Sequence, residues 1–160
     1  MSPRFPKFIS GGQTCAERGA LDFAIRNNIV HGGWCPKGRK AQDGAIPAIY
    51  QLQETLSDDY LESSEWNVRD SDATVIFTNT KEHSDMSQCV VDFARKHQKP
   101  WLHLGADSYT TARDLSRFMG EHEIGILNVT GASHVDVMNI FEGVFFWRWR
   151  AGIIGGPDEG

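Results

Sequence analysis

Short apolar runs alternate along the chain with longer segments in which apolar residues recur at helical spacing. The apolar runs predict strands at residues 8–9, 29–30, 49–54, 73–78, 100–104 and 124–129. The helical spacing predicts helices at residues 15–27, 58–70, 86–97, 109–121 and 134–149. Because strands that alternate with helices form βαβ units, the pattern predicts an α/β fold with a mostly parallel sheet covered on both faces.

A double glycine follows the first predicted strand and precedes the first helix. Gly11 and Gly12 let the backbone turn tightly, and Thr14 with Glu17 has the spacing of a capping box. The first amides of a helix have no partner within it and carry partial positive charge, so a phosphate or another oxyanion suits this turn. The segment has neither a G-x-G-x-x-G fingerprint nor a Walker loop, and an ordinary tight turn explains it equally well.

Three loops are predicted to meet at the carboxyl edge of the sheet, where α/β proteins bind ligands. They are residues 10–14, 78–85 and 130–133, each between a strand and a helix. Ser84 or Ser87 can cap the helix that follows the second loop, and Ser133 with Asp136 repeats the capping-box spacing at the third.

Residues 31–47 predict a long irregular loop, since they include four glycines and two prolines. Lys37, Arg39 and Lys40 form the densest basic cluster of the chain, which suits an anionic ligand better than a merely solvated loop. Arg69, Asp70 and Asp72 precede a strand. We expect Asp70 or Asp72 to cap the turn there and Arg69 to pair with it, in preference to a role in ligand binding.

Composition limits the function. The chain has 160 residues, 40% of them hydrophobic, which predicts one domain over residues 1–150 and a flexible glycine-rich tail over 151–160. A net charge of −5 argues against nucleic-acid and membrane partners, so any anion site must be a local concentration of positive potential. Scattered cysteines and the lack of a secretory signal favour a cytoplasmic location.

Neither the three cysteines nor the six histidines have the spacing of a metal site. Cys35 is a soft potential ligand, but a packed thiol is the better interpretation of a single cysteine. In the last helix Phe146 and Trp147 lie outside a wide apolar stripe, which favours a homo-oligomer assembled through this helix.

Three motifs resemble the family of putative molybdenum carriers: I-S-G-G-Q-T at residues 9–14, G-G-W-C-P-K-G-R at 32–39 with Asp43-Gly44, and W-N-V-R-D-S-D at 66–72. The similarity continues to residues 127–131. It implies a Rossmann-like, doubly wound sheet related to the lysine-decarboxylase-like nucleotide-binding superfamily, an oligomer, and binding of the molybdenum cofactor (molybdopterin) or a nucleotide. Cys15 stands where relatives carry a glycine, and residues 84–87 replace their glycine-rich loop, where Asp85 would repel an anion.

The favoured function is therefore a binding protein for a phosphorylated small molecule, with no catalytic residue or metal ligand assigned. The alternative is a nucleotide hydrolase of the phosphoribohydrolase type, but the chain lacks the P-G-G-x-G-T-x-x-E loop of those relatives, and Glu82 and Asp85 are poorly placed to replace it. A module for binding other proteins through the last helix is a third possibility. The candidate binding residues are Gly11, Gly12, Gln13, Thr14, Lys37, Arg39, Thr80, Ser84, Ser87, Gly131 and Ser133.

Overall fold

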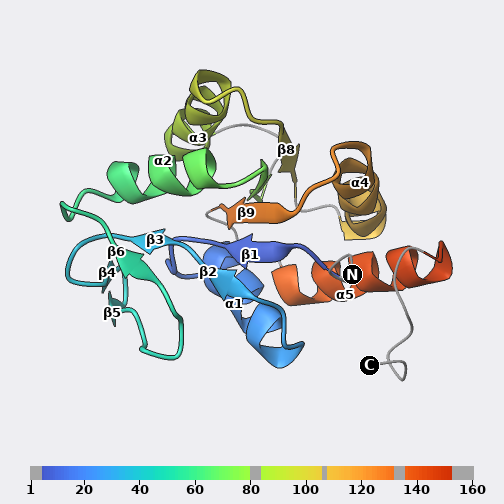
Figure 1. Cartoon of the computed structure of the whole chain (residues 1–160), viewed down its shortest axis with the longest axis horizontal. Coiled ribbons are helices and arrows are strands. Elements are labelled where there is room, and N and C mark those ends of the chain that lie inside the picture. The colour runs from blue at the N-terminus through green and yellow to red at the C-terminus, as the bar shows by residue number, and fades with distance from the viewer. Residues whose placement is uncertain (1–4, 80–83, 106–107, 132–135, 153–160) are drawn as a thin grey trace.

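A five-stranded parallel sheet forms the centre of the molecule (Figure 1). The computed structural model describes residues 5–79, 84–105, 108–131 and 136–152. The strands lie in the order β2-β1-β9-β7-β8, and every neighbouring pair is parallel. Their bounds are β1 Lys7–Ile9, β2 His31–Gly32, β7 Ala73–Phe77, β8 Trp101–Leu104 and β9 Ile126–Thr130.

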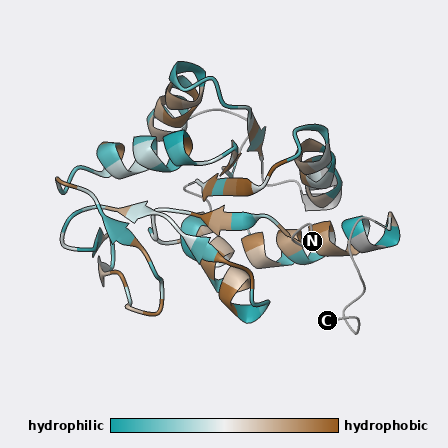
Figure 2. Cartoon of the chain, in the orientation of Figure 1, coloured by the Kyte–Doolittle hydropathy of each residue, from teal (hydrophilic) through white to brown (hydrophobic). Residues whose placement is uncertain are grey.

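Five helices among the described residues cover both faces of this sheet, which confirms the predicted α/β, doubly wound fold. They are α1 Ala16–Arg26, α2 Tyr60–Asp70, α3 Asp85–Lys96, α4 Ser108–Glu121 and α5 Val137–Arg150. Alternation along β7 shows the two layers: Val75 and Phe77 belong to the core beneath α1, α4 and α5, whereas Ile76 packs against α2 and α3. Figure 2 shows hydrophobic residues gathered on β1, β9 and the adjoining part of α5.

Residues 33–58 form a small lobe beside the main sheet. Its strands are two residues long: β3 Trp34–Cys35 pairs in parallel with β6 Gln53–Glu54, and β4 Lys40–Ala41 pairs antiparallel with β5 Gly44–Ala45. The predicted irregular loop is therefore partly regular, and the predicted strand at 49–54 is reduced to β6, outside the main sheet. The Arg39 guanidinium holds the lobe together by donating to four backbone carbonyls, those of Ile46, Pro47, Tyr50 and Leu52.

Side-chain caps follow the predictions in part. Ser84 caps α3, as predicted, because its hydroxyl accepts a hydrogen bond from the Ser87 amide at 3.2 Å. At α2 the cap is Asp59, which accepts from Leu61 N.

The turn between α2 and β7 follows the prediction in part, because Arg69 pairs with an aspartate but the side chain that bonds within the turn is Ser71, whose hydroxyl donates to the Val68 carbonyl at 2.9 Å. Arg69 pairs with Asp70 at 2.8 Å, and the Asp72 carboxylate accepts from the amides of Gly125 and Ile126. These contacts give the acidic cluster a structural role at the entrance to the sheet.

The outer face of α5 leaves two aromatic side chains in solvent. Phe146 is 46% exposed and Trp147 44%, whereas Phe141 and Val144 are buried, as the helical stripe predicts. An assembly through this face stays a prediction. In the part of the chain that is described, no helix combines the length and apolar character needed to cross a bilayer.

Candidate functional site

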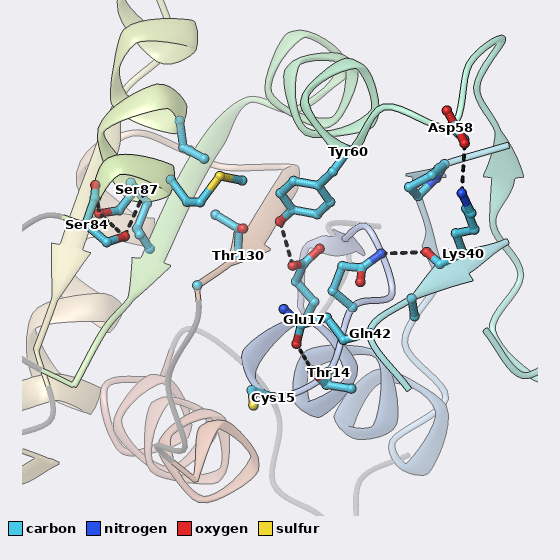
Figure 3. A pocket seen from close by; sticks show the side chains of 17 residues that line it. Thr14, Cys15, Glu17, Lys40, Gln42, Asp58, Tyr60, Ser84, Ser87 and Thr130 are labelled. Carbon is cyan, nitrogen blue, oxygen red and sulfur yellow. Dashed lines mark hydrogen bonds and ion pairs between the residues drawn. The ribbon is translucent and has the colours of Figure 1, made fainter. Parts of the chain in front are cut away.

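A cavity of about 770 Å³ opens at the carboxyl edge of the sheet. Its walls include residues that follow β1, β7 and β9, together with residues of the lobe, so the predicted convergence of three loops at this edge is confirmed. Figure 3 places Ser84 and Ser87 on one side of the cavity, Lys40 and Asp58 on the other, and Glu17, Tyr60 and Thr130 between them. The volume suits a small organic ligand.

Glu17 is the buried acid of this cavity. Its side chain enters from the first turn of α1 and is only 4% exposed. The Gly11 amide donates to Oε1 at 3.0 Å, and the Tyr60 hydroxyl donates to Oε2 at 2.9 Å. The carboxyl group therefore joins the glycine turn, α1 and α2 at one point.

Burial raises the pKa of Glu17 from its ordinary value of 4.5 to about 7. The Tyr60 hydroxyl, the amides of Gly11 and Gln13, and the Arg18 charge each oppose this rise. Burial and the neighbouring Glu17 carboxylate raise the pKa of the Tyr60 phenol well above its usual value, so it stays a donor at neutral pH. Glu17 accordingly changes charge near neutrality, in contact with the cavity.

At the glycine turn, a side chain of the protein itself binds one of the backbone amides. The Gly11 amide is occupied by Glu17, and neither Gly11 nor Gly12 lines the cavity, since both are buried. Gly12 has φ +76°, and a Cβ there would lie 2.6 Å from Leu52 Cδ1. The Gly11 amide is therefore bound by an internal carboxylate, and an external oxyanion elsewhere on this turn stays a prediction.

The capping box predicted at the start of α1 is wrong. The residue before α1 is Cys15, which makes no capping hydrogen bond through its side chain and adopts φ 70° and ψ −123°. Thr14 instead donates its hydroxyl to Gln42 Oε1 at 3.0 Å. The pair that the sequence spacing suggested is divided between two different contacts because Glu17 turns back to the Gly11 amide.

The lobe forms the far wall of the cavity and carries its cation. Lys40 Nζ lies 2.8 Å from Asp58 Oδ2, and the Lys40 carbonyl accepts from Gln13 Nε2 at 2.8 Å. The ion pair lowers the pKa of Asp58. Arg18 on α1 pairs with Asp43 through two hydrogen bonds, and this contact fastens the lobe to the helix.

The wall opposite the lobe carries the uncharged hydroxyl groups of Ser84 and Ser87. Ser87 is 5% exposed and donates its hydroxyl to the Ser84 carbonyl at 3.0 Å, at the N-terminus of α3. Gly131, with φ +139°, passes so close to β7 that a Cβ would lie 1.9 Å from the Phe77 carbonyl oxygen. Only glycine permits this approach, which places Gly131 itself in the cavity wall.

A family model described as the circularly permutated YpsA SLOG family matches residues 8–144. The chain belongs to this family. A crystal structure of a putative molybdenum carrier protein from Syntrophus aciditrophicus SB is 36% identical, covers 98% of each chain and superposes with a TM-score of 0.76. No curated protein matches the chain. The resemblance and the Rossmann-like fold drawn from the sequence motifs are thus confirmed.

In this YpsA SLOG chain, the cavity gathers about half of the predicted binding residues. Those that line it are Gln13, Thr14, Ser84, Ser87 and Gly131. Those that are described but do not line it are Gly11, Gly12, Lys37 and Arg39. Thr80 and Ser133 lie outside the described residues. Ligand contact at any of them stays a prediction.

The basic cluster contributes one residue to the cavity wall, and it is not one of the two that were predicted to bind the ligand. Lys37 is exposed and does not line the cavity, and the Arg39 guanidinium donates to the carbonyls of its own lobe. Lys40, in β4, is the basic residue among the described residues that line the cavity. A sequence motif locates the loop but not which of its cations faces inward.

Cys35 lies in the core of the lobe, with an exposed fraction of 0% and contacts to Leu21, Ile46 and Tyr50. Burial raises the pKa of its thiol. The interpretation as a packed thiol is confirmed. Within the described ranges, no group of three or more His, Cys, Asp or Glu side chains is arranged to hold a metal ion.

Sequence reasoning missed Glu17 and Tyr60 as site residues. A signal for Glu17 existed, because it lies on the same face of α1 as Ala20, Leu21 and Ala24, all of which are buried. An acid on an apolar helical face needs a partner or a function. Tyr60 carries no such signal, since its contact with Glu17 joins helices 43 residues apart.

We expect Glu17 to make stability fall as pH rises. Because its pKa is about 7 in the folded protein and 4.5 when exposed, its stabilising contribution is complete below pH 4.5 and is lost as pH rises through 7. The free energy of unfolding of the wild type should decrease by about 2 to 3 kcal/mol from this group between pH 5 and pH 8. Urea unfolding at several pH values measures this.

The matched variants are Glu17→Gln, which removes the titration, and Glu142→Gln, an exposed site on α5 that should leave it unchanged. A wild type whose pH profile coincides with that of Glu17→Gln would contradict the assignment.

We expect Cys15→Gly to stabilise the protein. A cysteine at φ 70° and ψ −123° is strained by about 1–3 kcal/mol, which glycine removes at an entropic cost of about 0.5–1 kcal/mol. The free energy of unfolding should rise by about 1 kcal/mol. Cys15→Ala retains the strain and serves as the control, and equal stability of the two variants would show that the backbone is unstrained.

Proposed function

We propose that this protein binds a phosphorylated small molecule in the cavity at the carboxyl edge of its sheet. The observation that carries the proposal is the lining itself: a lysine from the lobe and the hydroxyl-rich N-terminus of α3 lie on opposite sides of one space of about 770 Å³. Ammonium groups, hydroxyl groups and helix N-termini are the groups that proteins use to bind phosphates.

The two sides offer different chemistry to an elongated ligand. The α3 side presents Ser84 and Ser87 beside the positive end of a helix dipole. The lobe side presents Lys40 with Asp58, and the Gln13 and Gln42 amides near them. A nucleotide or a phosphorylated pterin has both a phosphate and a ring edge with donors and acceptors, so it matches this division.

We propose the molybdenum cofactor as the cargo within this class. The support is the name of the similar protein from Syntrophus aciditrophicus, a putative molybdenum carrier. The cofactor brings sulfur ligands for its own metal, so a carrier needs to hold only the phosphate and the pterin. Cofactor that co-purifies with the protein, measured as molybdenum together with pterin fluorescence after oxidation, would support this cargo.

Lys40→Met should weaken the binding of AMP, used as a phosphorylated probe, by about tenfold to hundredfold. This range corresponds to the loss of one charged hydrogen bond. Isothermal titration calorimetry measures it. Because the Lys40–Asp58 pair is largely exposed, the variant should fold with little loss of stability.

Two controls isolate the contact. Lys96→Met removes the same charge from the last turn of α3, outside the cavity, so AMP affinity should change less than about twofold. Adenosine, which has no phosphate, should bind the Lys40 variant as it binds the wild type. Equal losses in both lysine variants would show that overall charge, not contact, is responsible, and a failure of every phosphorylated probe to bind would refute the function.

A second candidate is hydrolysis of the base–sugar bond of a nucleoside monophosphate. Glu17 favours it, because a buried carboxyl group with a pKa of about 7 can serve as a general acid or base at neutral pH. Glu17 could supply the acid or base carboxylate that this reaction requires and that Glu82 and Asp85 are poorly placed to provide.

If the protein is such an enzyme, it should release adenine from AMP. Glu17→Gln should then lower the rate of adenine release by about 100-fold or more while AMP still binds. Chromatography of the reaction measures free base. Release that is equal in the two proteins would remove Glu17 from the reaction, and no release by the wild type would leave the binding function alone.

A further inference from the structure

We propose that Glu17 determines which charge state of a ligand the cavity accepts, because an anionic ligand binds together with one proton taken up by the Glu17 carboxylate. This inference rests on the proposed binding function and adds a selection rule to it. The proton comes from solvent and stays on the carboxyl group for as long as the ligand is bound.

Among the residues that the structure describes, Glu17 has no cation in direct contact. Its two oxygens accept from a peptide amide and a phenol, which are both neutral donors. No ion pair of Glu17 is found among the described residues. The carboxyl group is nevertheless part of the cavity wall, so a phosphate in that space would lie in a desolvated environment with an uncompensated like charge.

The charged groups on the elements packed around Glu17 do not neutralise its carboxylate. On α1, Arg18 has an electrostatic effect on Glu17, but its guanidinium is bound by Asp43. On α2, the facing group is the Tyr60 phenol. From the lobe, Lys40 is paired with Asp58.

The other elements around α1 bring no further charge to this point among the described residues that line the cavity. α3 contributes Ser84 and Ser87, and β9 with its following loop contributes Thr130 and Gly131. The Cys15 thiol at the start of α1 is titratable and lines the same space. β1 and α5 pack on α1 through aromatic contacts, such as those of Phe23 with Phe8 and Phe141.

Two states of the cavity follow. With Glu17 protonated, the wall is neutral there and a dianionic phosphate enters without repulsion. With Glu17 ionised, entry of the anion requires either a proton or the cost of two adjacent buried charges. Affinity for a dianion therefore falls as pH rises above neutrality, whereas a neutral analogue of the same size is insensitive to pH.

The test is calorimetry of AMP binding in two buffers of different ionisation enthalpy at pH 7.5, where the phosphate is already a dianion. Because Glu17, with a pKa of about 7, is already about one quarter protonated at this pH, we expect wild-type protein to take up about one half to three quarters of a proton per AMP bound. AMP affinity should fall about tenfold between pH 7 and pH 8.5, the limit being tenfold per pH unit for one proton. Adenosine should show neither effect.

Two variants separate titration from structure. Glu17→Gln keeps the shape and should bind AMP with no proton uptake and less than about a twofold change over the same pH range. Tyr60→Phe removes a hydrogen bond that stabilises the ionised carboxylate, so the pH at which AMP affinity begins to fall should move upward. Glu142→Gln, on the exposed face of α5, should behave as wild type.

The outcomes distinguish the two proposals. AMP binding without proton uptake by the wild type overturns the selection rule and leaves the binding function standing, and this measurement needs no variant. Proton uptake that persists in Glu17→Gln assigns the titration elsewhere and also overturns it. A wild-type protein that binds neither AMP nor any other phosphorylated probe at pH 6 or pH 7.5 overturns both proposals.

Discussion

The contact of the Glu17 carboxyl group with the Gly11 amide and the Tyr60 hydroxyl organises the cavity. A carboxylate taken out of water costs several kcal/mol unless hydrogen bonds or a proton compensate it. Here two neutral donors are supplied and burial brings the pKa to about 7, so the protein uses both means. The glycine turn must close tightly for its amide to reach the carboxyl group, which gives the double glycine a structural reason that needs no ligand.

The lobe has to be held against this centre because it shares no hydrogen-bonded strand with the main sheet among the described residues. Side chains of α1 do much of this. Arg18 binds Asp43, and the Asp22 carboxylate accepts from the Tyr50 hydroxyl at 2.6 Å. Helix α1 therefore supports the lobe with one set of side chains and lines the cavity with Glu17, so the cavity wall and the attachment of the lobe depend on the same helix.

Elements built from local patterns could be predicted, and contacts between elements could not. β7 and α3 follow from a β-branched run and from a capping serine, both of which act within a few residues. Lys40 and Arg39 are adjacent in sequence, but one faces the cavity and the other binds backbone carbonyls, because Arg39 adopts φ 54° within the folded lobe. The partner of Glu17 lies on another helix, and no spacing rule reaches that far.

The charge of the cavity explains why an acidic chain can hold an anion only under narrow conditions. Among the described lining residues, Lys40 is balanced by Asp58, and Glu17 adds either no charge or one negative charge. Net positive charge is therefore not available to attract a phosphate. A phosphate would therefore be held by directional hydrogen bonds. Their donors are the hydroxyl groups at the N-terminus of α3 and the ammonium group of Lys40, which can bind a ligand and Asp58 at the same time. Such a site selects a ligand by where its donors and acceptors lie, and its protonation state then decides whether a second negative charge is tolerated.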